Sequence, residues 1–219
     1  MAVGAARSVL KRLALAVSLV LAPGPLAAVD DQPGDFDFYV LALTWSPSYC
    51  ANARRPDPEQ CDLSRSSFNV HGLWPQFERG YPEDCRSTPY GLTRSDIASI
   101  SDVMPSGKEA AHAWNRHGTC SGLRPKAYFD LLRRAVAAVT IPTRYRAPET
   151  AIATSPRTIE ADFLAANPGL SERGFALSCS RQGVLQARIC LTKRLQFRRC
   201  ADVDRLTCRA PVVTLEPAR

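Results

Sequence analysis

Two of the three histidines in the chain lie in one short segment, HAWNRHGTC, as His112 and His117. The same segment contains Trp114 and Arg116. Imidazole titrates near neutral pH, so one of a pair can accept a proton while the other donates one. A guanidinium binds phosphate through two hydrogen bonds and stabilises negative charge on phosphoryl oxygens. These residue types predict acid–base chemistry on a phosphate ester.

The third histidine, His71, lies in a second segment, HGLWPQ, together with Trp74. An indole beside such groups offers a surface on which a nucleobase can stack, and Trp74 and Trp114 are both candidates. Neither segment contains a metal-binding motif, so the nucleophile must come from the substrate. RNA supplies one in its 2′-hydroxyl group, which DNA lacks. The two segments therefore predict cleavage of RNA without a metal ion.

Two other interpretations of the histidines remain open. They could be structural residues held by hydrogen bonds, or His71, His112 and His117 could bind a catalytic zinc ion. Zinc proteases with the HExxH motif space their histidines by four residues, whereas His112 and His117 are separated by five and have no second-shell carboxylate nearby. We therefore expect no metal and no cofactor.

The elements that must position these residues are a mixture of strands and helices. Apolar or alternating residues predict strands in FDFYVLALTWS, FALSCS and VLQARICL, and in SSFNVHGLWP, whose C-terminal end carries His71. Helices are expected after the cap residue Thr93, over Lys108–His117 with Gly118 as its stop, after Pro125, and after Ser155. Because no βαβ rhythm is present, we expect an α+β fold.

The N-terminal region predicts export. Three basic residues (Arg7, Lys11 and Arg12) precede the apolar run LALAVSLVLA, and small residues follow it. This pattern predicts a secretory signal over residues 1–28, followed by one domain over residues 29–219. A membrane anchor retained in the mature protein is the alternative. Removal of the signal would lower the formal net charge from +7 to +4, which mildly favours a polyanionic partner.

All eight cysteines follow the expected signal. An even number in an exported chain predicts disulfide bonds, but the spacing does not determine the pairing. We expect a secreted or periplasmic monomer, with RNA as substrate and no membrane attachment after the signal is removed.

Both histidine segments also resemble a known family. FNVHGLWPQ and HAWNRHGTC are similar to the two active-site segments of the ribonuclease T2 family, which read close to FxxHGLWP and HEWxKHGTC. The similarity extends to FYVLALTWSPSYC, YPEDC and ANPGL. The resemblance implies a disulfide-bonded α+β domain with a central antiparallel sheet and several packed helices. It also implies an endoribonuclease that cleaves single-stranded RNA with low base specificity.

The resemblance assigns a role to each motif residue. His71 would donate a proton to the leaving 5′-oxygen, His117 would take the proton of the 2′-hydroxyl, and His112 would help to hold the phosphate. Arg116 would stabilise the charged transition state, and a base would stack on Trp74. The products would be a 2′,3′-cyclic phosphate and then, more slowly, a 3′-phosphate.

Three positions depart from the family pattern. Arg116 replaces a lysine, which keeps the charge but changes its geometry, and Gln76 replaces an aspartate that many relatives carry near the base site. Ala113 replaces the glutamate of HEWxKHGTC, although Glu109 lies one turn earlier on the same helical face. Loss of such a group typically lowers the rate by about 10²–10³-fold. A weakened T2-fold effector that binds RNA or protein is therefore the alternative function.

The resemblance also implies a disulfide pattern, with one bridge close to the catalytic segment. The implied pairs are Cys50–Cys61, Cys85–Cys120, Cys179–Cys208 and Cys190–Cys200. The Cys85–Cys120 bridge would hold the end of HAWNRHGTC and so limit the movement of His117.

Overall fold

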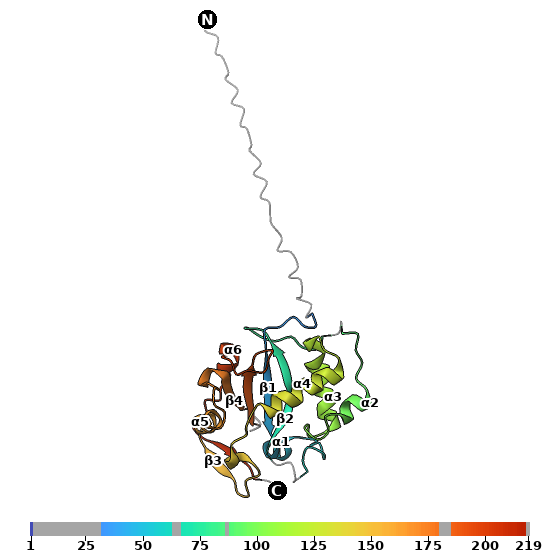
Figure 1. The fold of residues 1–219 in the computed structure, drawn as a ribbon. Helices are drawn as coiled ribbons and strands as arrows, with labels where there is room; N and C mark the ends of the chain where they lie inside the picture. The colour runs from blue at the N-terminus through green and yellow to red at the C-terminus, as the bar shows by residue number, and fades with distance from the viewer. Residues whose placement is uncertain (2–31, 63–66, 86–87, 180–184, 218–219) are drawn as a thin grey trace.

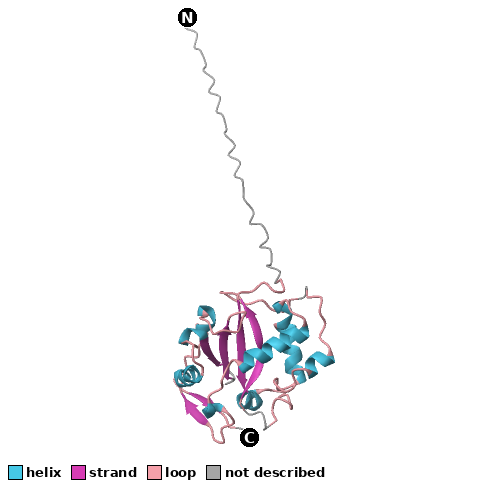
Figure 2. Cartoon of the chain, in the orientation of Figure 1, coloured by secondary structure: helices cyan, strands magenta, loops and turns pink. Residues whose placement is uncertain are grey.

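An antiparallel sheet of four strands forms the centre of the protein (Figure 1). The strands are adjacent in the order β2-β1-β5-β4, and each neighbouring pair is antiparallel. Their bounds are β1 Phe38–Trp45, β2 Phe68–Gln76, β4 Phe175–Cys179 and β5 Leu185–Leu191. Helices pack around this sheet (Figure 2), so the α+β prediction is confirmed.

The computed structural model describes residue 1 and residues 32–62, 67–85, 88–179 and 185–217. The predicted signal over residues 1–28 therefore lies outside the described residues, except for Met1. In the described part of the chain, no helix is both long and apolar enough to cross a membrane.

The four predicted helices are all present. They are α2 Arg94–Ala98, α3 Gly107–Arg116, α4 Pro125–Ala137 and α5 Pro156–Ala166. Two short helices and a small two-stranded sheet were not predicted: α1 Ser46–Asn52, α6 Ala201–Asp204, and the pair β3 Ile152–Thr154 with β6 Val213–Leu215. In Figure 1, α2, α3 and α4 group beside β2, whereas α5 and α6 lie at the opposite edge, beside β4.

The two faces of the sheet differ in what covers them. Side chains alternate between the faces along a strand, and Leu41 and Leu43 of β1 join the large core with residues of α3 and α4. On the other face, Phe38 and Val40 join a small cluster against which Trp74 packs. The second face is thus the one that carries the indole of the first histidine segment.

His71 lies inside β2 rather than at its end, which corrects the prediction. Pairing with β1 continues to Gln76 because the register shifts at one point: Ala42 pairs with Gly72, and Leu43 pairs with Val70. His71 is the extra residue of this β-bulge. Bulges bend a strand and redirect a side chain, so the bulge gives His71 a direction that regular alternation would not.

Four disulfide bonds connect all eight cysteines. They are Cys50–Cys61, Cys85–Cys120, Cys179–Cys208 and Cys190–Cys200, the same pairs that the family resemblance implied. Disulfides form and persist in oxidising compartments, so this set fits an exported protein.

Candidate active site

The bulged His71 contacts an acidic residue of helix α3. Its Nδ1 atom lies 2.6 Å from Oε1 of Glu109, and 27% of the His71 side chain and 14% of the Glu109 side chain are exposed. This is an ion-pair distance without hydrogen-bond geometry, since Oε1 of Glu109 has no hydrogen-bond partner among the described residues in this conformation. Nδ1 of His71 faces the carboxylate, and Nε2 is the other ring nitrogen.

Helix α3 sets the positions of Glu109, His112 and His117. Ser106 caps its N-terminus by accepting a hydrogen bond from the backbone N–H of Glu109 at 3.1 Å. The helix ends at Arg116, and His117 takes a non-helical conformation while its N–H still donates to the carbonyl of Ala113. His117 consequently leaves the helix surface at its last turn.

The segment after His117 is held from two directions. An added Cβ at Gly118 would lie 2.5 Å from an aromatic carbon of Trp114, so only glycine fits there. Cys120 is bonded to Cys85, and its carbonyl accepts a hydrogen bond from Gly34. These contacts restrict the backbone that carries His117.

Trp74 contacts two of the three histidines, and the third lies beside one of these two. Its ring stacks on His117, with centroids 4.7 Å apart and planes at 26°, and meets His71 edge-on at 5.7 Å. The ring of His112, an exposed residue, lies 5.9 Å from that of His71. We call these four residues the histidine cluster. The structure thus unites both predicted segments around a single indole.

The cluster shifts the ionisation of His117. Burial, the largest cause, and the positive charges of His71, His112, Arg116 and Arg188 together lower the pKa of His117 from 6.5 to about 3. The side chain is only 7% exposed. This environment keeps His117 neutral at neutral pH, which is the form that accepts a proton, although the lowered pKa also makes the imidazole a weaker base.

Arg116, the predicted transition-state cation, is already paired. Its two terminal nitrogens lie 2.6 Å from Oε2 of Glu83 and 2.6 Å from Oδ2 of Asp84. These carboxylates belong to the YPEDC segment noted in the sequence. Together they offset the charge of Arg116, so the guanidinium is bound to protein acids in this conformation.

Ala113 is fully buried, at 0% exposure. A Cβ added at Gly72 would lie 3.4 Å from the Cβ of Ala113 and 2.8 Å from Nε1 of Trp74. Gly72 also has φ +154°, a region that favours glycine. Helix α3 therefore packs closely on β2 at the position where the family pattern has glutamate.

Two residues predicted to bind substrate are buried. Trp114 is 1% exposed and packs edge-on against Tyr128 in the core, so its ring is covered by protein. Gln76 is 6% exposed, and its amide donates to the carbonyl of Pro75. The tryptophan was mistaken for a surface group because helical position alone does not show which side faces the core.

Sequence reasoning missed Arg188, which belongs to β5 but contacts the histidine cluster. The carbon of its guanidinium lies 5.3 Å from the Trp74 ring centroid. The sequence feature that could have indicated this residue is the presence of a charged side chain, Arg188, within VLQARICL, an otherwise largely apolar strand. Among the described residues, no group of three His, Cys, Asp or Glu side chains is placed to hold a metal ion.

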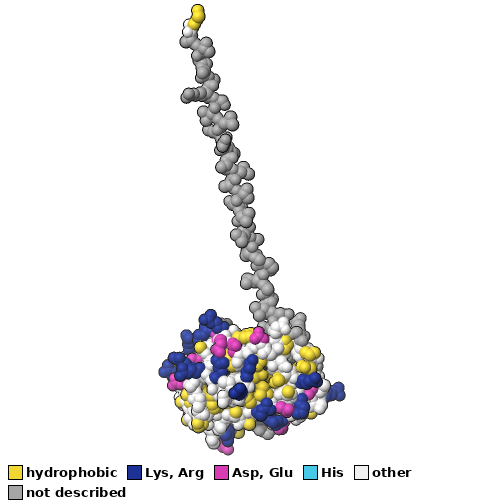
Figure 3. Space-filling model, turned by 45° about the horizontal axis from the view of Figure 1, so that its top comes forward, with side chains coloured by type: hydrophobic (Ala, Val, Ile, Leu, Met, Phe, Trp, Pro, Cys, Tyr) yellow, Lys and Arg dark blue, Asp and Glu magenta, His cyan; other side chains and the backbone are white. Residues whose placement is uncertain are grey.

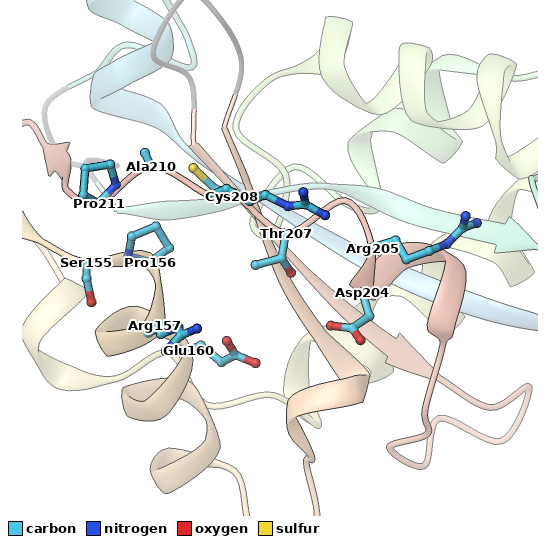
Figure 4. Close-up of a pocket in the computed structure, with 11 residues that line it drawn as sticks. Ser155, Pro156, Arg157, Glu160, Asp204, Arg205, Thr207, Cys208, Ala210 and Pro211 are labelled. Carbon is cyan, nitrogen blue, oxygen red and sulfur yellow. The ribbon is translucent and has the colours of Figure 1, made fainter.

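A separate hollow of about 420 Å³ lies at the far edge of the sheet (Figure 4). Its lining mixes charges of both signs, including Arg157, Glu160, Asp204 and Arg205. It is bordered by α5 and α6, which pack near β4, whereas the histidine cluster belongs to β2 and α3. The hollow is therefore distinct from the candidate active site.

Comparison with known proteins identifies the family. A model of the ribonuclease T2 family matches residues 36–200, which include the whole histidine cluster. The chain belongs to the ribonuclease T2 family. Its membership accounts for the two histidine segments occurring in one chain and in this order.

Individual relatives match part of the chain. A ribonuclease of Aeromonas hydrophila is 37% identical over 124 residues, covering 56% of this chain and 56% of that protein. Ribonuclease I of Escherichia coli (strain K12) is 31% identical over 163 residues, covering 55% and 61%. The chain thus spans only about half the length of the curated relatives it matches.

Solved structures share the fold. Trichomaglin, described as a novel S-like ribonuclease, aligns with a TM-score of 0.67 at 19% identity over 84% of this chain and 100% of that chain. A ribonuclease-related protein from Calystegia sepium aligns with a TM-score of 0.66 at 21% identity over 84% and 98%. At these identities the likeness shows the fold alone.

Proposed function

We propose that the protein is an endoribonuclease that cleaves single-stranded RNA through a 2′,3′-cyclic phosphate. The observation that carries the proposal is the contact of Trp74 with both His71 and His117, at 5.7 and 4.7 Å between ring centroids. This arrangement places a candidate acid and a candidate base beside one indole. Family membership adds support.

In the first step, neutral His117 takes the proton of the 2′-hydroxyl, and that oxygen attacks the adjacent phosphorus. The bond from phosphorus to the 5′-oxygen breaks, and His71 donates a proton to the departing oxygen. Glu109 acts through His71: with Nδ1 facing the carboxylate, Nε2 is the nitrogen that delivers the proton. In the second step, water opens the cyclic phosphate to a 3′-phosphate with the two histidine roles reversed.

His112 is assigned to hold the phosphate because its exposed ring borders His71. Arg116 would contribute positive charge only in part while Glu83 and Asp84 neutralise it. Trp74 is assigned to base stacking because its indole lies beside the candidate acid and base, and its ring already contacts His117 and Arg188. We further propose that the protein is exported and acts as a monomer, with the four disulfides in support of export.

The direct test is incubation of the oxidised protein with single-stranded RNA in excess chelator, across about pH 4 to 8 where histidine pairs titrate. We expect 2′,3′-cyclic phosphate ends with wild type and none with His117→Ala. A matched all-DNA strand should remain intact because it has no 2′-hydroxyl.

Intact RNA at every pH would reject the endonuclease. If RNA still bound, the alternative of a T2-fold binding protein would replace it. Cleavage that required added zinc would instead support a metal hydrolase.

A further inference from the structure

Arg188 lies on the same sheet face as Trp74, in a row of small residues. Directly opposite residues in neighbouring strands share a face, and Arg188 pairs with Ala42 on one side and with Ala176 on the other. The next residue in this row, beyond Ala42, is Gly72. No large side chain in the row therefore covers Arg188.

No acidic residue neutralises Arg188 within the described ranges. Its Nε donates to Oε1 of Gln186 at 2.9 Å, which orients the guanidinium, but no described carboxylate forms an ion pair with it. Arg116 and Arg198, by contrast, each pair with glutamate. Burial is the main reason that the pKa of Arg188 is lowered.

A partly buried cation without a counter-charge loses hydration and gains no ion pair in return. An anion bound beside it would supply the missing interaction, and a guanidinium suits phosphate through two parallel hydrogen bonds. The face in Figure 3 shows Lys and Arg in separate groups with Asp and Glu among them, not one continuous basic stripe.

Arg188 and His117 both contact the ring of Trp74. Its guanidinium carbon is 5.3 Å from the Trp74 ring centroid, and that ring is 4.7 Å from the His117 ring. Arg188 thus contacts the indole, and its charge reaches His117 as one of the causes that lower the pKa of that residue. Because the described contacts join Arg188 to the indole and none joins it to a histidine ring, we place its phosphate beside the scissile one.

We propose that Arg188 binds the RNA phosphate that flanks the scissile phosphate, on the sheet side of Trp74. The inference rests on the proposed ribonuclease function and adds a subsite to it. Arg188 is then a substrate-binding residue for RNA longer than a dinucleotide. A dinucleoside monophosphate has only the scissile phosphate and cannot use the subsite.

The test compares UpU with UpUpU as substrates for wild type and Arg188→Met, which keeps the apolar stem over Trp74. Loss of a hydrogen-bonded charge pair predicts that the ratio of kcat/KM for UpUpU to that for UpU falls about tenfold. The slope of log KM for UpUpU against log salt should become shallower by about 0.7. Arg188→Lys should recover part of the ratio, and Arg134→Ala, an exposed arginine of α4, should change neither quantity.

An equal loss on both substrates would overturn the proposal, because it would mean that Arg188 acts only by packing on Trp74. An unchanged ratio and salt slope would overturn it as well. If wild type cleaves neither substrate, the ribonuclease proposal fails, and calorimetric binding of 2′-O-methyl UpUpU and UpU decides the subsite. Equal affinities of wild type and Arg188→Met for the trinucleotide would then reject it.

Discussion

Glu109 Oε1 lies 2.6 Å from His71 Nδ1, joining the first turn of α3 to the bulge of β2. The family pattern has its glutamate four residues later, at Ala113, where this chain has no carboxylate. The structure therefore shows a different acidic residue in contact with a histidine of the cluster. We propose that this residue acts as a positioning residue for the proposed acid.

Substitution of Glu109 by glutamine should lower kcat at least about tenfold and leave KM nearly constant, because proton donation by a misoriented imidazole is less effective. Steady-state kinetics measures this split, and ¹⁵N NMR of His71 reports the tautomer directly. Glu59→Gln is the matched control, since Glu59 accepts from the N–H of Gly107 at the start of the same helix. Equal kinetic losses in the two variants would assign Glu109 a merely structural role.

The lowered pKa of His117 predicts that acid weakens the fold. Between about pH 6.5 and 3 the folded protein keeps His117 neutral, whereas the unfolded chain binds a proton there. The unfolded state then binds more protons, so the free energy of unfolding falls as pH decreases through this range. The positively charged groups that face His117 are His71, His112, Arg116 and Arg188.

Urea unfolding at pH 7 and pH 4 measures this contribution, which should be about 3 kcal/mol for His117 alone. His117→Asn cannot bind the proton and should lose correspondingly less stability between the two conditions. Parallel losses in wild type and variant would show that His117 titrates normally in the folded state.

The Cys85–Cys120 bridge should matter more for activity than for secondary structure. Cys85→Ala/Cys120→Ala frees the segment after His117, and displacements of about 1 Å can cost about 10²-fold in rate. We expect a loss of that order with helix content retained in circular dichroism, together with about 2–4 kcal/mol of stability. Reduction of the wild-type bonds should likewise remove activity before helix content.

Cys50→Ala/Cys61→Ala is the control, because that bridge links α1 to the loop after it. It should lower stability with a much smaller effect on kcat. Similar kinetic losses in both double variants would contradict a specific link between the Cys85–Cys120 bridge and His117.

Local patterns were sufficient for most elements but not for the exact place of His71. The cap at Thr93 and the prolines at the starts of α4 and α5 act within one helical turn, so sequence alone locates these helices. Gly72 and Pro75 suggested that the strand ends near His71. Pairing with β1 instead carries β2 to Gln76, and such pairing depends on residues distant in sequence.

The same limit applies to the charged residues around the site. The four-residue spacing predicts that Glu109 and Ala113 lie on the same face of the helix. The contact between Glu109 and His71, however, depends on how α3 packs against β2. In the sequence, Arg188 is one polar position in a strand of alternating residues, and this pattern does not indicate a place in the site. Its position near Trp74 requires the order β2-β1-β5, which short-range patterns do not contain.

Restoring the family glutamate by Ala113→Glu should not restore a faster enzyme. The position is 0% exposed, and its Cβ is in van der Waals reach of a Cβ added at Gly72. A glutamate side chain there would overpack the core and bury a carboxylate. It would also lie one helical turn from Glu109, which carries a like charge. We therefore expect the free energy of unfolding to fall by about 2 kcal/mol or more. Thermal unfolding and kcat measured together test this, with Asn115→Glu, an exposed position of α3, as the control. A variant with wild-type stability and higher kcat would show instead that this site can still accept the glutamate and that Glu109 has not replaced it.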